Sequence, residues 1–169
     1  MRLLLMRHGV AVEPGDPAFP SDHDRPLSPQ GRKRTIATVR GMLELGIKPD
    51  RIVTSPLRRA RQTAEIVAAE FSIGGGQLSE SAGLTPDADP QQIAREVRGY
   101  SADECVVLIG HEPHLSMLAS HLLTGESDGM DILLKKAAVC GIELSGGEAR
   151  GTLHFLLQPK HLRAAADGD

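Results

Sequence analysis

The stretch Arg2-Leu3-Leu4-Leu5-Met6-Arg7-His8-Gly9 opens the chain and decides what fold to expect. Its four consecutive apolar residues are typical of a strand that is buried on both faces, as in a parallel sheet. Two basic side chains and a glycine follow at once, so polar groups are displayed where this strand ends. We therefore expect residues 2–6 to form a strand that presents Arg7 and His8 at the edge of a sheet.

Further along the chain, short apolar runs alternate with segments of helical periodicity, which indicates an α/β domain with a largely parallel sheet. Capping residues and prolines mark where the helices begin. The further strands are expected at residues 51–53, 105–109, 139–144 and 153–157, and the helices begin at Ser28-Pro29, Ser55-Pro56, Asp89-Pro90 and Pro113. The last two strands flank Gly146-Gly147, which predicts an antiparallel hairpin at the sheet edge.

Residues 1–162 are expected to form a single domain, and residues 163–169, rich in Ala and Asp, a frayed tail. The first helix is expected to end before Gly46 and to bury Ile36, Val39 and Leu43. The second helix places Leu57, Ala60, Ala64, Val67 and Phe71 on one apolar face.

Composition excludes several classes of protein. The chain has 169 residues, of which 40% are hydrophobic and 24% charged, values that suit one globular domain. A net charge of −3 and an aromatic content of 2% argue against a nucleic-acid partner, which requires clustered cations or stacking rings. No stretch approaches the roughly 20 apolar residues of a membrane span, and the first apolar run is too short for a signal peptide. Cys105 and Cys140 lie in apolar runs, which favours reduced thiols and a cytoplasmic location.

Two connections, residues 10–27 and 72–89, are longer than ordinary turns and are therefore candidates for ligand-binding loops. In a parallel sheet such loops gather at the carboxyl ends of the strands, where α/β folds bind ligands. The first of them leaves directly from Arg7-His8-Gly9.

Arg7-His8-Gly9 combines residue types that suit a substrate with phosphate oxygens. A histidine fixed by one ring nitrogen presents the lone pair of the other, and an arginine provides a forked cation for phosphate oxygens. Gly9 allows the backbone to turn closely beside a ligand. Taken alone, the tripeptide is more typical of a basic pair on a solvated surface.

A second basic element follows the second expected strand. Arg58, Arg59 and Arg61 lie in the first two turns of the helix that begins at Ser55-Pro56. Cations are unfavourable at this end of the helix dipole, so an anionic ligand explains them better than helix stability does. A solvated basic face remains the alternative. Gly110-His111 provides a third basic element after another expected strand.

Three segments together resemble the motifs of the histidine phosphatase superfamily and occur in that family's order. They are Leu5-Met6-Arg7-His8-Gly9, Ser55-Pro56 with Arg59-Ala60 and Gln62-Thr63, and Gly110-His111. The resemblance spans residues 2 to about 160. Asp22-x-x-Arg25-Pro26-Leu27-Ser28 and Leu84-Thr85-Pro86 resemble its short bacterial phosphohistidine phosphatases of the SixA type. The resemblance implies a phosphoglycerate mutase-like fold: three α/β/α layers, a mostly parallel central sheet and an antiparallel edge strand.

The resemblance also implies roles for individual residues. His8 would be the nucleophile that carries the phosphoryl group as a covalent intermediate, while Arg7, Arg59 and His111 would bind the phosphoryl oxygens and stabilise their charge. Arg25 is a further candidate for substrate contact. The spacing from Ser55 and the apolar stripe of the helix both favour Arg59 over Arg58.

A proton donor is harder to identify. Many relatives carry a glutamate on a long insertion, and this chain has no convincing equivalent. Asp22 is the first candidate, ahead of Glu13 and Asp87, although each is equally well a solvated loop charge. A phosphoramidate needs such an acid less, because imidazole, with a pKa near ~6.5, leaves more easily than an alkoxide.

We therefore expect removal of phosphate from phosphohistidine on a protein, such as a phosphotransfer domain in signal transduction. Phosphate or a similar anion would occupy the site, with no cofactor and no metal. His111-x-x-His114 does not form the helical zinc motif, because Glu112 and Pro113 break its pattern. Two alternatives remain open: a phosphomonoesterase of the same fold that acts on small molecules, and a non-catalytic phosphate-binding regulatory module.

Overall fold

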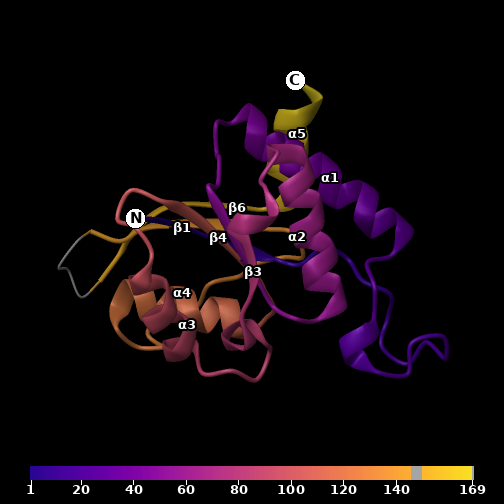
Figure 1. The fold of residues 1–169 in the computed structure, drawn as a ribbon, viewed down its shortest axis with the longest axis horizontal. Helices are drawn as coiled ribbons and strands as arrows, with labels where there is room; N and C mark the ends of the chain where they lie inside the picture. Colours follow the sequence, from indigo (N-terminus) through magenta and orange to yellow (C-terminus); the bar gives the residue numbers. More distant parts are fainter. Residues whose placement is uncertain (146–149, 169) are drawn as a thin grey trace.

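The computed structural model describes residues 1–145 and 150–168, and its centre is one sheet in the order β3-β2-β4-β1-β5-β6 (Figure 1). The strands are β1 (Arg2–Arg7), β2 (Arg51–Thr54), β3 (Leu78–Glu80), β4 (Cys105–Gly110), β5 (Val139–Glu143) and β6 (Thr152–Leu157). The first four are mutually parallel, whereas β5 is antiparallel to both of its neighbours. The fold class is therefore the expected one, and the pair at the β6 edge is antiparallel.

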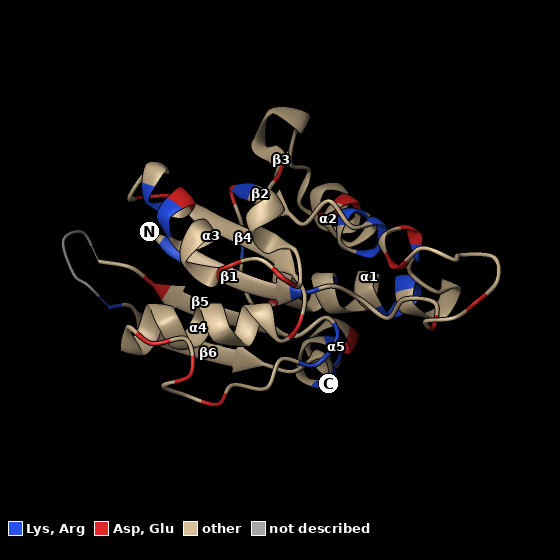
Figure 2. Ribbon diagram, turned by 90° about the horizontal axis from the view of Figure 1, so that it is seen from below, with Lys and Arg blue, Asp and Glu red and all other residues tan. Residues whose placement is uncertain are grey.

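Helices cover both faces of this sheet, which gives the expected three layers (Figures 1 and 2). The helices are α1 (Pro29–Glu44), α2 (Arg58–Phe71), α3 (Pro90–Glu96), α4 (His114–Thr124) and α5 (Pro159–Asp167). On β1, Leu3 and Leu5 belong to the core beneath α3 and α4, while Leu4 and Met6 belong to the core beneath α1, α2 and α5. Alternate residues of one apolar run thus fill two separate cores, as burial on both faces requires.

The expected strands and helices are present, with differences at particular positions. The short parallel strand β3 lies inside the segment that we interpreted as the loop 72–89; its three residues carry little strand signal. The turn Gly146-Gly147 lies outside the described residues, while the two strands that flank it are paired as expected. Cys105 and Cys140 are free and buried, which agrees with reduced thiols.

The prediction for the start of the second helix is wrong by two residues. Its N-cap is Leu57, not Ser55. The backbone N–H of Ser55 donates to Ile109 O at 2.9 Å, which extends the pairing of β2 with β4. Ser55 directly follows β2 and its backbone is still bonded to β4, so the helix begins after it.

The buried face of α1 also differs from the expected stripe. Val39 is buried as expected, but Leu43 is 37% exposed, and Thr35, Thr38 and Met42 are buried in the place we gave to Ile36 and Leu43. The two threonine hydroxyls donate to helix carbonyls, which makes their burial inexpensive. A pattern of apolar residues in the sequence does not identify these two threonines as buried.

The expected frayed tail is helical as far as Asp167. Leu162 is fully buried in the core of α1 and α2. A Cβ atom at Gly41 of α1 would overlap the backbone of Leu162, so the two helices approach more closely than side chains normally permit. Burial of Leu162 orders a segment whose composition alone suggests disorder.

Candidate active site

A polar cavity of about 330 Å³ lies at the carboxyl ends of β1 and β4, beside the start of α2. Its lining combines residues from both ends of the chain: Arg7, His8, Ala11, Glu13, Pro14, Asp22, Arg25, Arg59, Pro86, His111, Glu112 and Lys136. All the expected catalytic and substrate-binding residues are among them, as are the proton-donor candidates Asp22 and Glu13, whereas the third candidate, Asp87, does not line the cavity. Parallel pairing explains the convergence, because Arg7 lies opposite Gly110 in the β1–β4 register.

His8 follows β1 and is only 6% exposed. Its Nδ1 lies 2.6 Å from Gly9 O, and since a carbonyl only accepts, Nδ1 carries the proton. The lone pair of Nε2 is therefore free, and it accepts a hydrogen bond from Arg59 Nε at 3.3 Å. Burial, aided by the neighbouring cations, lowers the pKa of His8 to about 3. The ring is neutral at pH 7, which is the form in which an imidazole is nucleophilic.

Arg59 is the second residue of α2, and the helix directs it into the cavity with only 4% exposure. Its Nη1 donates to Asp22 O at 2.7 Å and its Nη2 to Asp22 Oδ2 at 3.0 Å. Burial lowers its pKa, and Asp22 opposes that shift. The neighbouring Arg58 is half-buried outside the cavity, with its guanidinium over the ring of Phe19. The structure places Arg59 and not Arg58 in the cavity, although the cap from which the spacing was counted is not the one observed.

His111 follows β4 and is 2% exposed. The rings of His8 and His111 are tilted by 54° with their centroids 4.9 Å apart. His111 Nε2 lies 2.8 Å from Ser55 Oγ, while its Nδ1 is buried without a partner among the described residues. Burial, followed by the proximity of His8, lowers the pKa of His111 to about 2.

Arg7, the last residue of β1, is held by the segment that leads to β5. Its Nη1 donates to Leu134 O at 2.9 Å, and its buried Nε has no hydrogen-bond partner among the described residues. Burial lowers its pKa, and the charge of Glu112 opposes this. Buried polar atoms normally have partners, so Arg7 Nε and His111 Nδ1 fit a ligand with several oxygen acceptors. A phosphoryl group is such a ligand.

Asp22 and Arg25 form the rim contributed by the first long loop. Arg25 donates to Asp22 Oδ1 from Nε at 2.8 Å and from Nη2 at 2.5 Å, and its Nη1 donates to Val12 O. Burial acts to raise the pKa of Asp22, but the hydrogen bonds from Arg25 and Arg59 outweigh it and lower the pKa. The carboxylate therefore stays ionised and positions two arginines.

Gly9 has a different role from the one expected. A Cβ atom there would overlap the hydroxyl of Thr35 on α1. The glycine therefore allows the backbone to pack closely against that helix, whereas we expected it to leave space for a ligand. Its N–H donates to Thr63 Oγ1 at 3.1 Å, and Thr63 Oγ1 donates to Arg59 O. The backbone beside His8 is thereby tied to the helix that carries Arg59.

Ser55, Glu112 and Lys136 are site residues that sequence reasoning did not select. Ser55 was interpreted as a helix cap and as part of the family motif but was given no role in the site, and Glu112 was interpreted only as an interruption of a zinc motif. Lys136 gave no signal, since it lies in an irregular segment 128 residues after His8. Ala137, with a positive φ of 67°, fixes this segment by donating its N–H to Arg7 O and His8 O.

Within residues 1–145 and 150–168, no group of three or more His, Cys, Asp or Glu side chains is arranged to hold a metal ion. In the same residues, none of the helices has the length and apolar character needed to cross a bilayer.

Comparisons with known proteins agree with this geometry. The sequence profile of the histidine phosphatase superfamily (branch 1) matches residues 3–84. An uncharacterized protein of Picosynechococcus sp. is 37% identical over 170 residues, which cover 96% of this chain and 99% of the relative. The mitochondrial serine/threonine-protein phosphatase Pgam5 of Drosophila sechellia is 38% identical over 69 residues, 41% of this chain and 22% of that protein.

Among solved structures, the protein histidine phosphatase SixA complexed with tungstate superposes with a TM-score of 0.82 at 25% identity. The superposition covers 96% of this chain and 99% of that one. The sequence match begins at β1 and includes the segments of His8 and Arg59, and the structural match extends over the rest of the fold. The chain belongs to the histidine phosphatase superfamily.

Proposed function

We propose that this protein is a phosphohistidine phosphatase that uses His8 as its nucleophile. The observation that carries the proposal is the state of His8: a neutral ring with Nδ1–H bound to Gly9 O and the Nε2 lone pair beside Arg59. A module that only binds phosphate needs the arginines but has no use for this lone pair. The similarity to a protein histidine phosphatase supports the choice of substrate class.

In the proposed reaction, His8 Nε2 attacks the phosphorus atom and the P–N bond to the substrate imidazole breaks. The substrate ring leaves as neutral imidazole when its other nitrogen already carries a proton, so the enzyme need not supply a strong acid. Water then attacks the phosphoryl group on His8, releasing inorganic phosphate and restoring the neutral ring.

We assign Arg7, Arg59 and His111 to the phosphoryl oxygens, where charge accumulates in the transition state. Arg25 lies at the rim and is proposed to contact substrate. For Asp22 we favour positioning of Arg59 over the role of proton donor, because a carboxylate held by two guanidinium groups has no proton to give. The cationic side chains take the charge-neutralising role of a metal, so we expect activity without one. A cytoplasmic location stays a prediction.

The test compares kcat/KM for a phosphotransfer domain phosphorylated on histidine with that for sugar phosphates and an aryl phosphate, with and without a chelator. We expect the phosphohistidine protein to be the best substrate and the chelator to have no effect. An acid-labile phosphoryl adduct on the wild-type protein, absent in His8→Ala, would identify the intermediate. Faster turnover of sugar phosphates would favour the phosphomonoesterase, and phosphate binding without turnover the regulatory module.

A further inference from the structure

A second cavity of about 460 Å³ lies beside the active site, between the start of α4 and the segment that leads to β5. We call it the methionine groove and define it by Ser116, Met117, Asp128, Met130, Asp131 and Leu133. Met117, Met130 and Leu133 are 38%, 44% and 65% exposed. They are half of the large hydrophobic side chains exposed in residues 1–145 and 150–168, so apolar exposure is concentrated here. Gathered apolar exposure of this kind is typical of an interaction surface.

The methionine groove and the active site share a wall. Ser116 Oγ lies 2.6 Å from Glu112 Oε2, on a residue that lines the active site, and 2.6 Å from Ile132 O in the groove. On the same segment, Leu134 O accepts the hydrogen bond from Arg7, and Lys136 lines the active site. A protein bound in the groove would therefore lie next to the phosphoryl site.

The rim of the groove is acidic. Asp128 and Asp131 are exposed, and neither has an ion-pair partner among the described side chains. Figure 2 shows acidic positions along the segment that follows α4. These charges attract Lys and Arg on a partner and repel the anionic surface of a membrane or a nucleic acid. Methionine side chains adapt to differently shaped apolar partners.

We propose that the methionine groove docks the protein substrate, by binding an apolar patch that is flanked by Lys or Arg and lies close to the phosphohistidine. The proposal rests on the proposed function, because it assumes that the substrate is a protein. The groove supplies binding energy remote from the reacting phosphoryl group, while the polar cavity performs the chemistry.

Leu133→Glu tests the apolar part, and the double variant Asp128→Lys/Asp131→Lys tests the charge. The matched control is Leu45→Glu, which changes an apolar side chain that is 50% exposed at the other end of the molecule. The substrates are a phosphotransfer domain phosphorylated with phosphoramidate, and p-nitrophenyl phosphate, which is too small to reach the groove. Activity on the small ester also reports that each variant is folded.

We expect Leu133→Glu to raise KM for the phosphoprotein about tenfold, the loss typical of an interface contact, while the small ester is unaffected. The double variant should lose affinity at low salt, and the difference from wild type should shrink as salt is added. Equal losses with Leu45→Glu, or none with either groove variant, would overturn the proposal while leaving the proposed function intact. Wild-type protein that does not act on the phosphoprotein would overturn the proposed function itself. Binding of anionic vesicles that Leu133→Glu abolishes would assign the groove to a membrane instead.

Discussion

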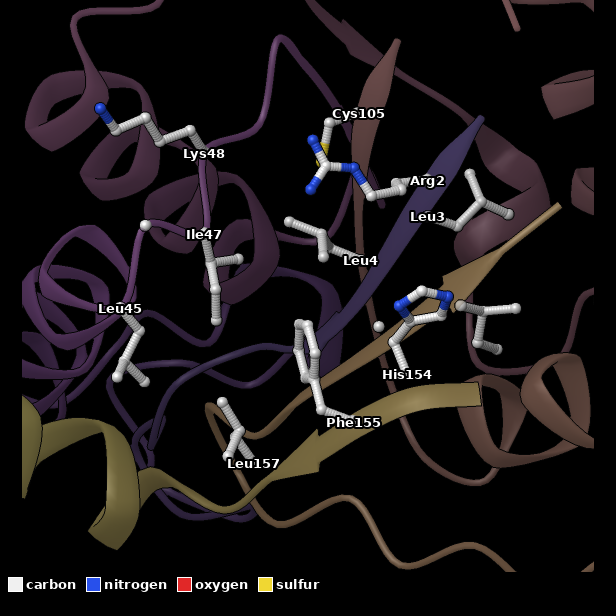
Figure 3. A pocket seen from close by; sticks show the side chains of 13 residues that line it. Arg2, Leu3, Leu4, Leu45, Ile47, Lys48, Cys105, His154, Phe155 and Leu157 are labelled. Carbon is white, nitrogen blue, oxygen red and sulfur yellow. The ribbon is translucent and has the colours of Figure 1, made fainter. Parts of the chain in front are cut away.

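Two cavities of similar volume lie at opposite ends of the sheet, about 330 Å³ at the carboxyl ends of β1 and β4 and about 350 Å³ near their amino ends. Figure 3 shows the second, in which Leu45, Ile47, Phe155 and Leu157 surround an apolar space. In the first, two histidines and three arginines line one cavity, and His8, Arg59 and His111 are buried.

The difference shows how to recognise a site of chemistry in this molecule. Burial of like cationic groups is unfavourable for the fold, and it lowers the pKa of both histidines. Such an arrangement is typical of functional sites, where groups that lower the stability of the fold are retained because they are reactive. The basic residues that line the second cavity, Arg2, Lys48 and His154, are exposed to water, so the side chains of this cavity should matter for stability and not for turnover.

The largest effect is expected at His8, the proposed nucleophile. His8→Ala should reduce kcat on an aryl phosphate by on the order of 10³ or more, because the covalent route is lost rather than weakened. Steady-state assays measure it, with circular dichroism to confirm folding, since His8 is more buried than its position at a strand end suggested. A folded variant that keeps more than a few per cent of activity would exclude the covalent mechanism.

Arg58 and Arg59 allow a comparison within one turn of α2, because only Arg59 lies in the polar cavity. Arg59→Ala should lower kcat/KM by roughly 10², the loss typical of one charge-stabilising donor. Arg58→Ala should have a much smaller effect on a small ester, because its side chain lies over Phe19 outside the cavity. Equal losses in the two variants would contradict the conclusion that α2 directs Arg59, and not Arg58, toward the bound phosphoryl group.

Asp22→Asn separates positioning from proton donation. It weakens the ion pair with Arg59 but leaves the bond to the Asp22 carbonyl, so we expect a several-fold loss of kcat/KM. The loss should be uniform across aryl phosphates of increasing leaving-group pKa, whereas loss of an acid would affect poor leaving groups most. A steeper slope in the variant would restore Asp22 as the donor.

The pH dependence of stability tests the buried histidines. The pKa of His8 is about 3 and that of His111 about 2 in the folded state, against roughly 6.5 in the unfolded chain. As pH falls from about 7 to 5, the unfolded state binds protons that the folded state does not, so the free energy of unfolding decreases. Urea unfolding in phosphate-free buffer measures this, and His8→Ala should show a shallower decrease. An identical decrease would mean that His8 titrates normally.

The smallest effect on activity is expected in the apolar cavity. Phe155 is half-buried and packs over Gly141, where a Cβ atom would overlap its ring. Phe155→Ala should lower the free energy of unfolding by about 2 kcal/mol, below the range for a fully buried phenylalanine. Turnover of an aryl phosphate should not change; a large loss of kcat there would make the two ends of the sheet functionally coupled.

Most of the fold could be predicted from local sequence, but elements with a weak local signal could not. Residues 2–6 are apolar enough to specify a buried strand, and Ser28-Pro29 specifies a helix start through one side-chain hydrogen bond to Gly31. By contrast, β3 and the end of α5 are ordered by contacts with β2 and α1. Their own residues carry little of that information.

The sequence by itself predicted that Arg7, His8 and His111 lie together at the candidate site, but it did not predict that Ser55, Glu112 and Lys136 join them. Arg7 ends β1, while His8 and His111 directly follow β1 and β4, and the carboxyl ends of such parallel strands share one edge of the sheet. Only the tertiary structure decided the state of those side chains. Burial keeps His8 neutral, and Asp22 accepts hydrogen bonds from Arg59. Leu134 bonds Arg7, and Lys136 lines the cavity. All of these interactions join segments that are far apart in the chain. The protonation and orientation of the site side chains are set by surroundings that exist only after folding.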